Sequence, residues 1–398
     1  MRQRLRVIIY NAQEDCSAAI RADLLSLDGV QIVAEVDEIA LVEQAVKQFP
    51  AEILMVNLDP APQTVLPVVA DIAGTRSEPA VFVLSGSTDA QLILTAMRCG
   101  VREFLTKPLD RSLLAVATGR VASANVATRD IGQLISVFGT IGGVGASMLA
   151  ANLAAELNDL AEKKPVALVD LDFRFGQLAT MLDLQAEYTI ADLCETPEQL
   201  DPAMIGKAMI RHPSGVHLLA RPNQFSQADQ ITAAHCASVL SSLQQLYKYV
   251  VVDGPIRFDP GGSAVIDLAD VSLFVIQLLV TSIRNTHRVF TELREHGYNL
   301  DRFQLVCNRI GQESGHLAGA HVEKTLNKKI AHRIPDDWKT ASSAINVGVP
   351  LIELAPKSRV RLAIREIAES IAQPPAAQAV ARNHGRGGLL GRIFTGAS

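Results

Sequence analysis

The feature that most constrains the fold is a glycine loop between an apolar run and a helix-forming segment. Residues 134–138 predict a buried strand, and residues 148–157 favour a helix. Between them residues 139–147 read Gly-Thr-Ile-Gly-Gly-Val-Gly-Ala-Ser. Strand, glycine turn and helix in this order build a phosphate-binding loop, because glycines let backbone amides curl around a phosphate and the helix N-terminus adds partial positive charge. The residues expected to contact the ligand are Gly142, Gly143, Val144, Gly145, Ala146, Ser147 and Met148.

This loop lacks its main charge. The usual phosphate-binding loop places Lys directly before the Ser or Thr, and here that position is Ala146. The sequence therefore predicts a nucleotide site whose cation has been removed.

Composition excludes several classes of protein. A chain of 398 residues suggests two domains, and 48% hydrophobic with 20% charged residues is typical of globular proteins. A net charge of -5 argues against broad nucleic-acid binding. Five scattered cysteines without a CxxC pair give no support to a disulfide framework or a zinc site. Residues 1–6 lead directly into a predicted strand without a signal-peptide apolar region, and no stretch is long enough for a membrane span, so we expect a cytoplasmic protein.

Residues 1–120 alternate short apolar runs with helical patterns, five times over. Nearly continuous apolar strands imply a parallel sheet covered on both faces, which predicts a flavodoxin-like, doubly wound α/β domain. Residues 121–133 are small and polar, and they predict a short linker or the end of the last helix. The predicted strands are residues 7–10, 31–34, 53–56, 80–84 and 103–105.

The ends of these strands resemble a response-regulator receiver domain. Lys107-Pro108 is similar to that family's Lys-Pro turn, and Ser85 fits its Ser/Thr switch position. Asn57 stands where the family has the phosphoacceptor Asp, and an amide cannot form an acyl phosphate because it lacks the anionic nucleophile. A register slip of two would instead make Asp59 the acceptor, and Lys107 is equally consistent with a surface residue that closes a turn. We expect a pseudo-receiver, a binding and dimerisation module that phosphate does not switch.

Residues 134–372 alternate strand and helix patterns, which predicts a second α/β domain with a larger parallel sheet. Several motifs in this segment resemble those of the MinD/ParA ATPases. They are the Gly-Gly-Val-Gly order, Asp170 and Asp172 after the next strand, Asp253 after a later one, and Asn308-Arg309 with Pro335-Asp336 beyond. The resemblance implies ATP and Mg²⁺ as ligands. It implies that Ser147 and Asp253 hold the metal, that Asp170 or Asp172 orients the attacking water, and that Asn308, Arg309, Pro335 and Asp336 lie on the adenine side. Taken singly, these Asp residues are also consistent with ordinary turns at strand ends.

Two departures from that family matter for activity. Its loop carries two lysines, and here Ile141 and Ala146 replace them. A charge-assisted hydrogen bond contributes roughly 1.5 to 3 kcal/mol, so loss of the second lysine should weaken nucleotide binding by about one to two decades. Hydrolysis should be weak or absent, because the lost cation also neutralises charge in the transition state. The alternative is a domain that binds no nucleotide and keeps the glycines only for the turn.

Residues 373–398 predict a flexible tail with a short amphipathic tip. The apolar side chains Leu389, Leu390, Ile393 and Phe394 fall on one helical face beside arginines. The tip is consistent with peripheral membrane contact or partner docking, or with a frayed and disordered end.

A pseudo-receiver fused to a MinD/ParA-like domain with a degraded loop resembles the TadZ/CpaE family of pilus-assembly proteins. The resemblance implies a homodimeric scaffold for the Tad (Flp) type IV pilus secretion machinery, recruited to the inner membrane at a cell pole or assembly site. The competing hypothesis is an active ATPase that cycles between monomer and membrane-bound dimer to position cargo. A chromosome-partition protein is less favoured, since the net charge is acidic.

Overall fold

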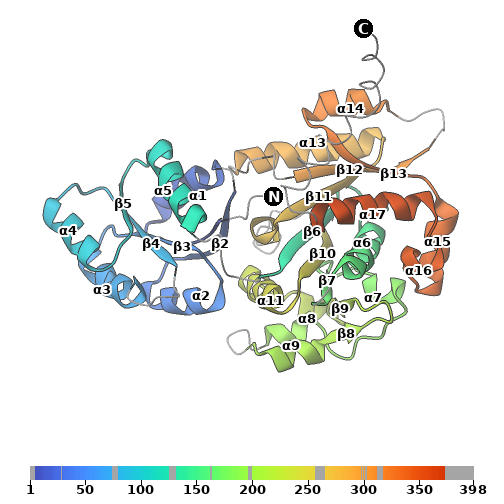
Figure 1. Cartoon of the computed structure of the whole chain (residues 1–398), viewed down its shortest axis with the longest axis horizontal. Coiled ribbons are helices and arrows are strands. Elements are labelled where there is room, and N and C mark those ends of the chain that lie inside the picture. Colours follow the sequence, from blue (N-terminus) through green and yellow to red (C-terminus); the bar gives the residue numbers. More distant parts are fainter. Residues whose placement is uncertain are drawn as a thin grey trace, which may run out of the picture.

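The computed structural model describes residues 5–372, apart from residues 28, 74–78, 125–130, 162–163, 196–199, 256–264, 297, 299, 301–302 and 312–316. The chain forms two α/β domains that lie side by side (Figure 1). The predicted tail at residues 373–398, with its apolar tip, lies outside the described residues.

The first domain is a five-stranded parallel sheet in the order β2-β1-β3-β4-β5. This confirms the predicted doubly wound fold, and the apolar runs are buried as expected, with all six residues of β1 out of solvent. Helices α1 and α5 cover one face of the sheet, and α2, α3 and α4 cover the other (Figure 1). The elements are β1 (Leu5–Tyr10), α1 (Glu14–Leu25), β2 (Val30–Val36), η1 (Ile39–Leu41), α2 (Val42–Gln48), β3 (Ile53–Asn57), α3 (Pro62–Ala73), β4 (Ala80–Ser85), α4 (Ala90–Arg98), β5 (Glu103–Thr106) and α5 (Arg111–Ala124).

The second domain has an eight-stranded sheet in the order β13-β12-β11-β6-β10-β7-β9-β8. All of its pairings are parallel except that of β8 with β9, so the short edge strand β8 departs from the all-parallel sheet that the sequence predicts. The strands are β6 (Gln133–Gly139), β7 (Val166–Asp170), β8 (Met209–Arg211), β9 (His217–Leu219), β10 (Tyr249–Pro255), β11 (Val271–Ile276), β12 (Phe303–Ile310) and β13 (Ile330–Pro335).

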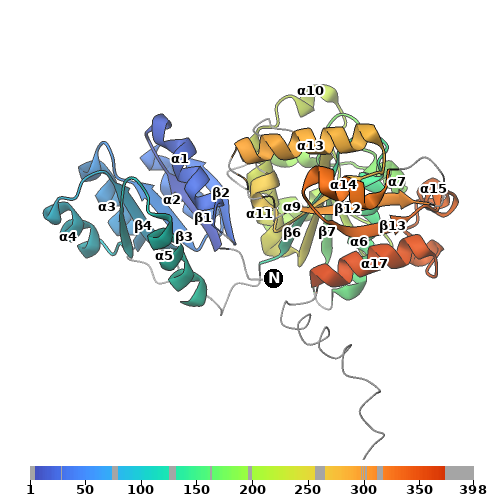
Figure 2. The same ribbon diagram turned by 90° about the horizontal axis from the view of Figure 1, so that it is seen from above.

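Helices pack on both faces of this second sheet. One face carries α6, which follows the glycine loop, together with the C-terminal α17 (Figure 2). The opposite face carries α11 and α13. The helices are α6 (Ala146–Leu160), α7 (Leu178–Met181), α8 (Ile190–Cys194), α9 (Pro202–Ala208), α10 (Phe225–Ala228), α11 (Ala233–Leu246), α13 (Val280–Glu295), α14 (Gly319–Leu326), α15 (Trp338–Val347), α16 (Leu351–Leu354) and α17 (Arg359–Ala372).

A buried ion-pair network anchors the glycine-loop helix to the end of the described chain. Glu156 on α6 has a side chain that is only 1% exposed, and Arg361 and Arg365 of α17 both donate to it. The contact from Arg361 is bidentate, with Nε–Oε1 at 2.6 Å and Nη2–Oε2 at 2.9 Å. Charge-assisted pairs of this geometry fix orientation as well as adding stability. Helix α6 is therefore held rigidly beneath the loop.

The two domains share a polar seam. The Arg21 guanidinium of α1 contacts the Asp267 carboxylate at 2.5 Å and the Tyr298 hydroxyl at 2.9 Å, and that hydroxyl donates to Asp267 at 2.7 Å. Gln31 donates to the carbonyl of Leu268, and Gln48 donates to the Ser238 hydroxyl. These contacts join α1, β2 and α2 to the face of the second sheet that carries α11.

Candidate nucleotide pocket and a second polar site

The glycine loop leaves β6 and enters α6 with the backbone geometry that its glycines permit. Gly143 and Gly145 have φ of 72° and 97°, in the left-handed region where other residues are strained. A Cβ on Gly145 would also lie 2.4 Å from the amide nitrogen of Asn308, so only glycine fits there. No atom lies within 4 Å of a Cβ built on Gly142 or Gly143, so this part of the loop faces open space.

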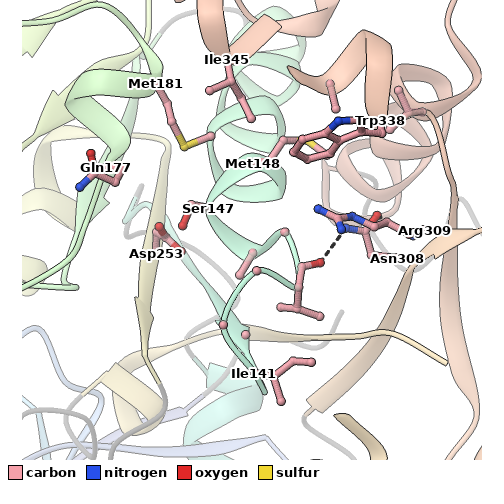
Figure 3. A pocket seen from close by; sticks show the side chains of 18 of the residues that line it. Ile141, Ser147, Met148, Gln177, Met181, Asp253, Asn308, Arg309, Trp338 and Ile345 are labelled. Carbon is pink, nitrogen blue, oxygen red and sulfur yellow. Dashed lines mark hydrogen bonds between the residues drawn. The ribbon is translucent and has the colours of Figure 1, made fainter. Parts of the chain in front are cut away.

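Asn308, at the end of β12, ties the loop to the neighbouring strand. It is 3% exposed, and its side-chain amide donates to the Val144 carbonyl at 2.8 Å (Figure 3). Its side-chain oxygen accepts from the Arg309 backbone N–H at 2.9 Å. The sequence placed Asn308 on the adenine side, and in the structure its visible contacts hold the loop in shape.

One cavity of about 490 Å³ collects most of the predicted site. That volume is within the range of small-molecule pockets, which run from about 300 to 1,000 Å³. The predicted residues that line it are Ile141, Gly142, Gly143, Val144, Gly145, Ala146, Ser147, Met148, Asp172, Asp253, Asn308, Arg309, Pro335 and Asp336. Three other lining residues, Gly139, Gly254 and Asp337, belong to the predicted motifs but were not predicted as site residues. The sequence did not indicate Gln177, Met181, Trp338, Ala341, Ile345 and Val360. Of these, only Trp338 has a sequence signal that could have identified it, because it is the sole tryptophan and lies two residues after Asp336.

Asp253 and Ser147 meet at the loop end of the cavity. The Ser147 side chain lies beside the Asp253 carboxylate (Figure 3). The pKa of Asp253 is raised to about 6, because burial and the charge of Asp172 together outweigh the lowering effect of the neighbouring Ser147 hydroxyl. A carboxylate beside a hydroxyl, next to open loop amides, fits Mg²⁺ and a phosphate, since Mg²⁺ prefers oxygen ligands.

Asp170 and Asp172, the two candidates for orienting water, have different surroundings. Asp170 is 2% exposed, accepts from the backbone N–H groups of Asp172 at 3.2 Å and Leu178 at 3.2 Å, and does not line the cavity. Its burial, followed by the charge of Asp253, raises the pKa of the carboxyl to about 7. Asp172 lines the cavity and accepts from the Phe175 N–H at 3.1 Å. Asp172 is therefore the better placed of the two to reach a ligand, and Asp170 shapes the loop after β7.

Known proteins share this pocket-bearing domain. No protein-family model matches the chain. The septum site-determining protein MinD of Synechocystis is 27% identical over 245 residues, which cover 60% of this chain and 89% of that protein. A ParA family ATPase from Chlorobium tepidum superposes with a TM-score of 0.57 at 22% identity, covering 60% of this chain and 98% of that structure. The structure of Pyrococcus horikoshii MinD with Mg-ADP gives 0.53 at 18% identity, covering 63% and 98%.

The second domain is a MinD/ParA-like P-loop domain. The match spans only about 60% of the chain, so it leaves the first domain and the pilus-assembly resemblance without support. Ile141 and Ala146, the positions at which the resemblance leads us to expect lysines, both line the cavity, and Arg309 is the one basic residue among the described residues that line it.

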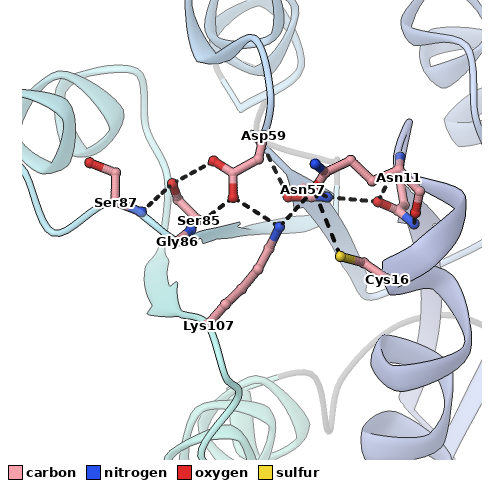
Figure 4. Close-up of polar contacts among 9 residues, drawn as sticks. Asn11, Cys16, Asn57, Asp59, Ser85, Gly86, Ser87 and Lys107 are labelled. Atoms are coloured by element: carbon pink, nitrogen blue, oxygen red, sulfur yellow. Dashed lines mark hydrogen bonds and ion pairs between the residues drawn. The ribbon is translucent and has the colours of Figure 1, made fainter.

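A second polar site lies at the strand ends of the first domain. Asp59, two residues after β3, accepts from the Ser85 hydroxyl at 2.9 Å, the Gly86 N–H at 2.8 Å and the Lys107 ammonium at 2.9 Å (Figure 4). Burial raises the pKa of Asp59, but the hydrogen bonds from Lys107, Gly86 and Ser85 outweigh it, and the net shift is downward. Lys107 is thus engaged in an internal ion pair.

Asn57, the predicted acceptor position, belongs to a separate set of contacts. It is the last residue of β3, pairs with Leu84 of β4 and is 1% exposed. Its amide donates to the Asn11 side-chain oxygen at 2.7 Å and to Gln13 at 3.1 Å (Figure 4). Amide-to-amide bonding here takes the place of the acidic groups that a metal-dependent site would need.

Two further features are absent from the described residues. These residues contain no cluster of three or more His, Cys, Asp or Glu side chains suited to a metal ion. Within the same residues, no helix has the length and apolar character needed to cross a bilayer.

Proposed function

We propose that this chain is a localisation and assembly factor of the TadZ/CpaE type. It acts as a homodimeric scaffold for the Tad (Flp) type IV pilus secretion machinery, recruited to the inner membrane at a cell pole or assembly site. The observation that carries the proposal is the cavity of the MinD/ParA-like domain. It keeps the loop, Ser147 and Asp253 but has Ile141 and Ala146 at both lysine positions.

The retained residues suit binding better than turnover. Mg²⁺, held by Ser147 and Asp253, would neutralise phosphate charge on a bound ATP. The open amides around Gly142 and Gly143 would contact that phosphate. Transition-state charge would meet no lysine, and loss of one such stabilising group typically costs a factor of 10² to 10³ in rate. ATP is then a weak or structural ligand.

The first domain supports the same interpretation. Its Lys107 is paired with Asp59, and its Asn57 is bonded to two amide side chains, so the last residue of β3 offers an amide and no carboxylate nucleophile. A domain of this kind serves as a binding surface. The pilus components that it contacts are the proposed partners.

Two measurements test the scaffold. Purified full-length chain with ATP and Mg²⁺ should release phosphate no faster than Asp253→Asn, which removes the proposed metal ligand. In cells, loss of the chain should displace the pilus secretion proteins from their site, and a chain carrying Asp172→Asn, which lacks the carboxylate placed to orient water, should restore them. Turnover that Asp253→Asn abolishes, together with failure of Asp172→Asn in cells, would refute the scaffold.

The alternative is an ATPase that cycles between monomer and membrane-bound dimer to position cargo. The observation that favours it is Asp172, which lines the cavity near Asp253 and is placed to orient a water. In that case ATP should shift the sedimentation of the chain from monomer to dimer, and hydrolysis should reverse the shift.

A further inference from the structure

The cavity of the MinD/ParA-like domain has two chemically different ends. Ser147 and Asp253 lie at one end, and Arg309 and Trp338 lie together at the other, with Met148 between them (Figure 3). A nucleotide has the same division, with an anionic phosphate chain and a flat apolar base. The balance between the two ends therefore decides which part of a nucleotide supplies the affinity.

The phosphate end of the cavity has no basic side chain among the described residues that line it. Ile141 and Ala146 stand at the lysine positions, and the side chains that line this end include the carboxylates of Asp172 and Asp253. Each charge-assisted contact that is missing removes about tenfold or more from the affinity for a phosphate. Additional phosphates on a ligand therefore gain little here beyond what Mg²⁺ and backbone amides supply.

The base end has the opposite character. The Arg309 guanidinium carbon lies over the Trp338 ring, 5.0 Å from its centre and within cation–π range, and we call this pair the Arg309–Trp338 wall. Arg309 has φ of 56°, in the left-handed region, where the pairing of β12 with β13 is irregular. Trp338 is 58% exposed although it lines the cavity, and the apolar residues Met148, Ile345 and Val360 complete the surround.

We propose that the cavity recognises a purine nucleotide mainly through its base, which stacks on the Arg309–Trp338 wall, and that affinity hardly depends on the number of phosphates. This rests on the nucleotide binding of the proposed function and specifies its ligand class. Wall and base are both planar, and alanine substitution at base–aromatic stacks commonly costs fivefold to a hundredfold in affinity. The chain then responds to the adenine nucleotide pool as a whole and not to the ratio of ATP to ADP.

The chain provides its own probe, because Trp338 is its only tryptophan. Titration of the full chain with ATP, ADP and AMP in Mg²⁺ should change the tryptophan fluorescence with dissociation constants within about fivefold of one another, because a stacked base contacts the fluorophore. Inorganic triphosphate should neither change the signal nor displace AMP. A dissociation constant for ATP more than about thirtyfold below that for AMP would overturn the proposal.

Two substitutions and a control locate the effect, with binding followed by calorimetry. Trp338→Ala should weaken ATP, ADP and AMP alike, by about tenfold or more. Phe225→Ala removes an aromatic side chain of equal exposure that does not line the cavity, and it should leave all three constants unchanged. Equal constants for Trp338→Ala and Phe225→Ala would overturn the base wall.

Ala146→Lys separates this proposal from the scaffold. It should tighten ATP by one to two decades and AMP far less, because only the phosphate chain reaches the new ammonium. If the natural chain binds none of the three nucleotides while Ala146→Lys binds ATP, the base wall is refuted and the non-hydrolysing scaffold stands. If the natural chain binds all three equally yet turns over ATP, the base wall stands and the scaffold falls.

Discussion

Each domain has a polar site at the ends of its strands, and each site lacks a group that its related family would carry there. The two sites differ in whether a basic side chain neutralises their carboxylates. In the first domain the Asp59 carboxylate is paired with Lys107 at 2.9 Å, and Ser85 and Gly86 complete its contacts. In the MinD/ParA-like domain, Asp170 and Asp253 are almost fully buried, and no lysine lines the neighbouring cavity among the described residues. The carboxylate of the first site is neutralised by a lysine of the same domain and therefore stabilises the fold. The carboxylates of the second site have no such lysine in the part of the chain that the structure describes, so a bound cation or ligand can supply the positive charge.

The same difference gives the two sites opposite responses to pH. The pKa of Asp59 is lowered, so its contribution to stability is present above the ordinary carboxyl range and is lost as pH falls through its folded pKa, below about pH 4. The pKa values of Asp170 and Asp253 are raised to about 7 and about 6. Between about pH 4 and pH 7 the folded state therefore binds more protons than the unfolded state, and these two groups destabilise the fold as pH rises.

The largest expected effect comes from Asp170. With EDTA and no nucleotide, Asp170 alone should lower the free energy of unfolding by about 4 kcal/mol between pH 4 and pH 7.5, because folding raises its pKa from 3.8 to about 7 and one pKa unit is worth about 1.4 kcal/mol. Asp170→Asn removes the titrating group and should flatten most of this slope, measured by urea unfolding at several pH values. Asp59→Asn is the matched carboxylate-to-amide control, and it should leave the slope in place. A slope unchanged by Asp170→Asn would contradict the assignment.

The substitution Ala146→Lys would give the second site a basic side chain, as Lys107 does for Asp59 in the first site. Ala146→Lys brings an ammonium into the cavity beside Asp172 and Asp253, so it should raise the stability at pH 7.5 by about 1 to 2 kcal/mol and reduce the pH slope. Ala146→Met, of similar length and without charge, is the control. Equal stabilisation by Lys and Met would attribute the gain to packing and remove the electrostatic contrast between the two sites.

The sequence predicts most of the fold because the apolar runs are unambiguous. Both sheets follow from short buried strands that alternate with helical patterns. Ser147 in the first turn of α6, Asp253 of β10 and Asn308 of β12 lie together because parallel strands end at one edge. Strand β8 was missed because three residues at an edge carry too little periodicity to recognise.

What sequence could not supply is the pairing of side chains across long separations. Lys107 was as consistent with a surface turn as with a site, and only the fold brings its ammonium to Asp59, 48 residues away. The wall of Arg309 and Trp338 depends in the same way on the turn after β13, which places α15 over the end of β12. Asp170 and Asp172 look alike in sequence, and their separate surroundings appear only once the loop after β7 is folded.

A smaller effect is expected at the first site. Asp59→Asn keeps the shape of the side chain but breaks the ion pair with Lys107, whose side chain is 20% exposed. Partly exposed pairs contribute about 0.5 to 1 kcal/mol, so the free energy of unfolding at pH 7 should fall by roughly that amount. Lys107→Met should cost a similar amount, and the double variant no more than either single variant. Strictly additive losses would show that the two groups do not interact.

The smallest expected effect is none at all, and it concerns phosphoryl transfer. Incubation of the full chain with a small phosphoryl donor and Mg²⁺ should add no phosphate detectable by mass spectrometry, because Asn57 is an amide and the Asp59 carboxylate is held by three donors. If phosphate is added, the variants Asn57→Ala and Asp59→Asn show which residue it depends on. Phosphate removed by Asp59→Asn and kept by Asn57→Ala would make Asp59 an acceptor and the first site a working switch. The contrast would then be reversed, since the site with its own counter-charge would be the one that opens to a ligand.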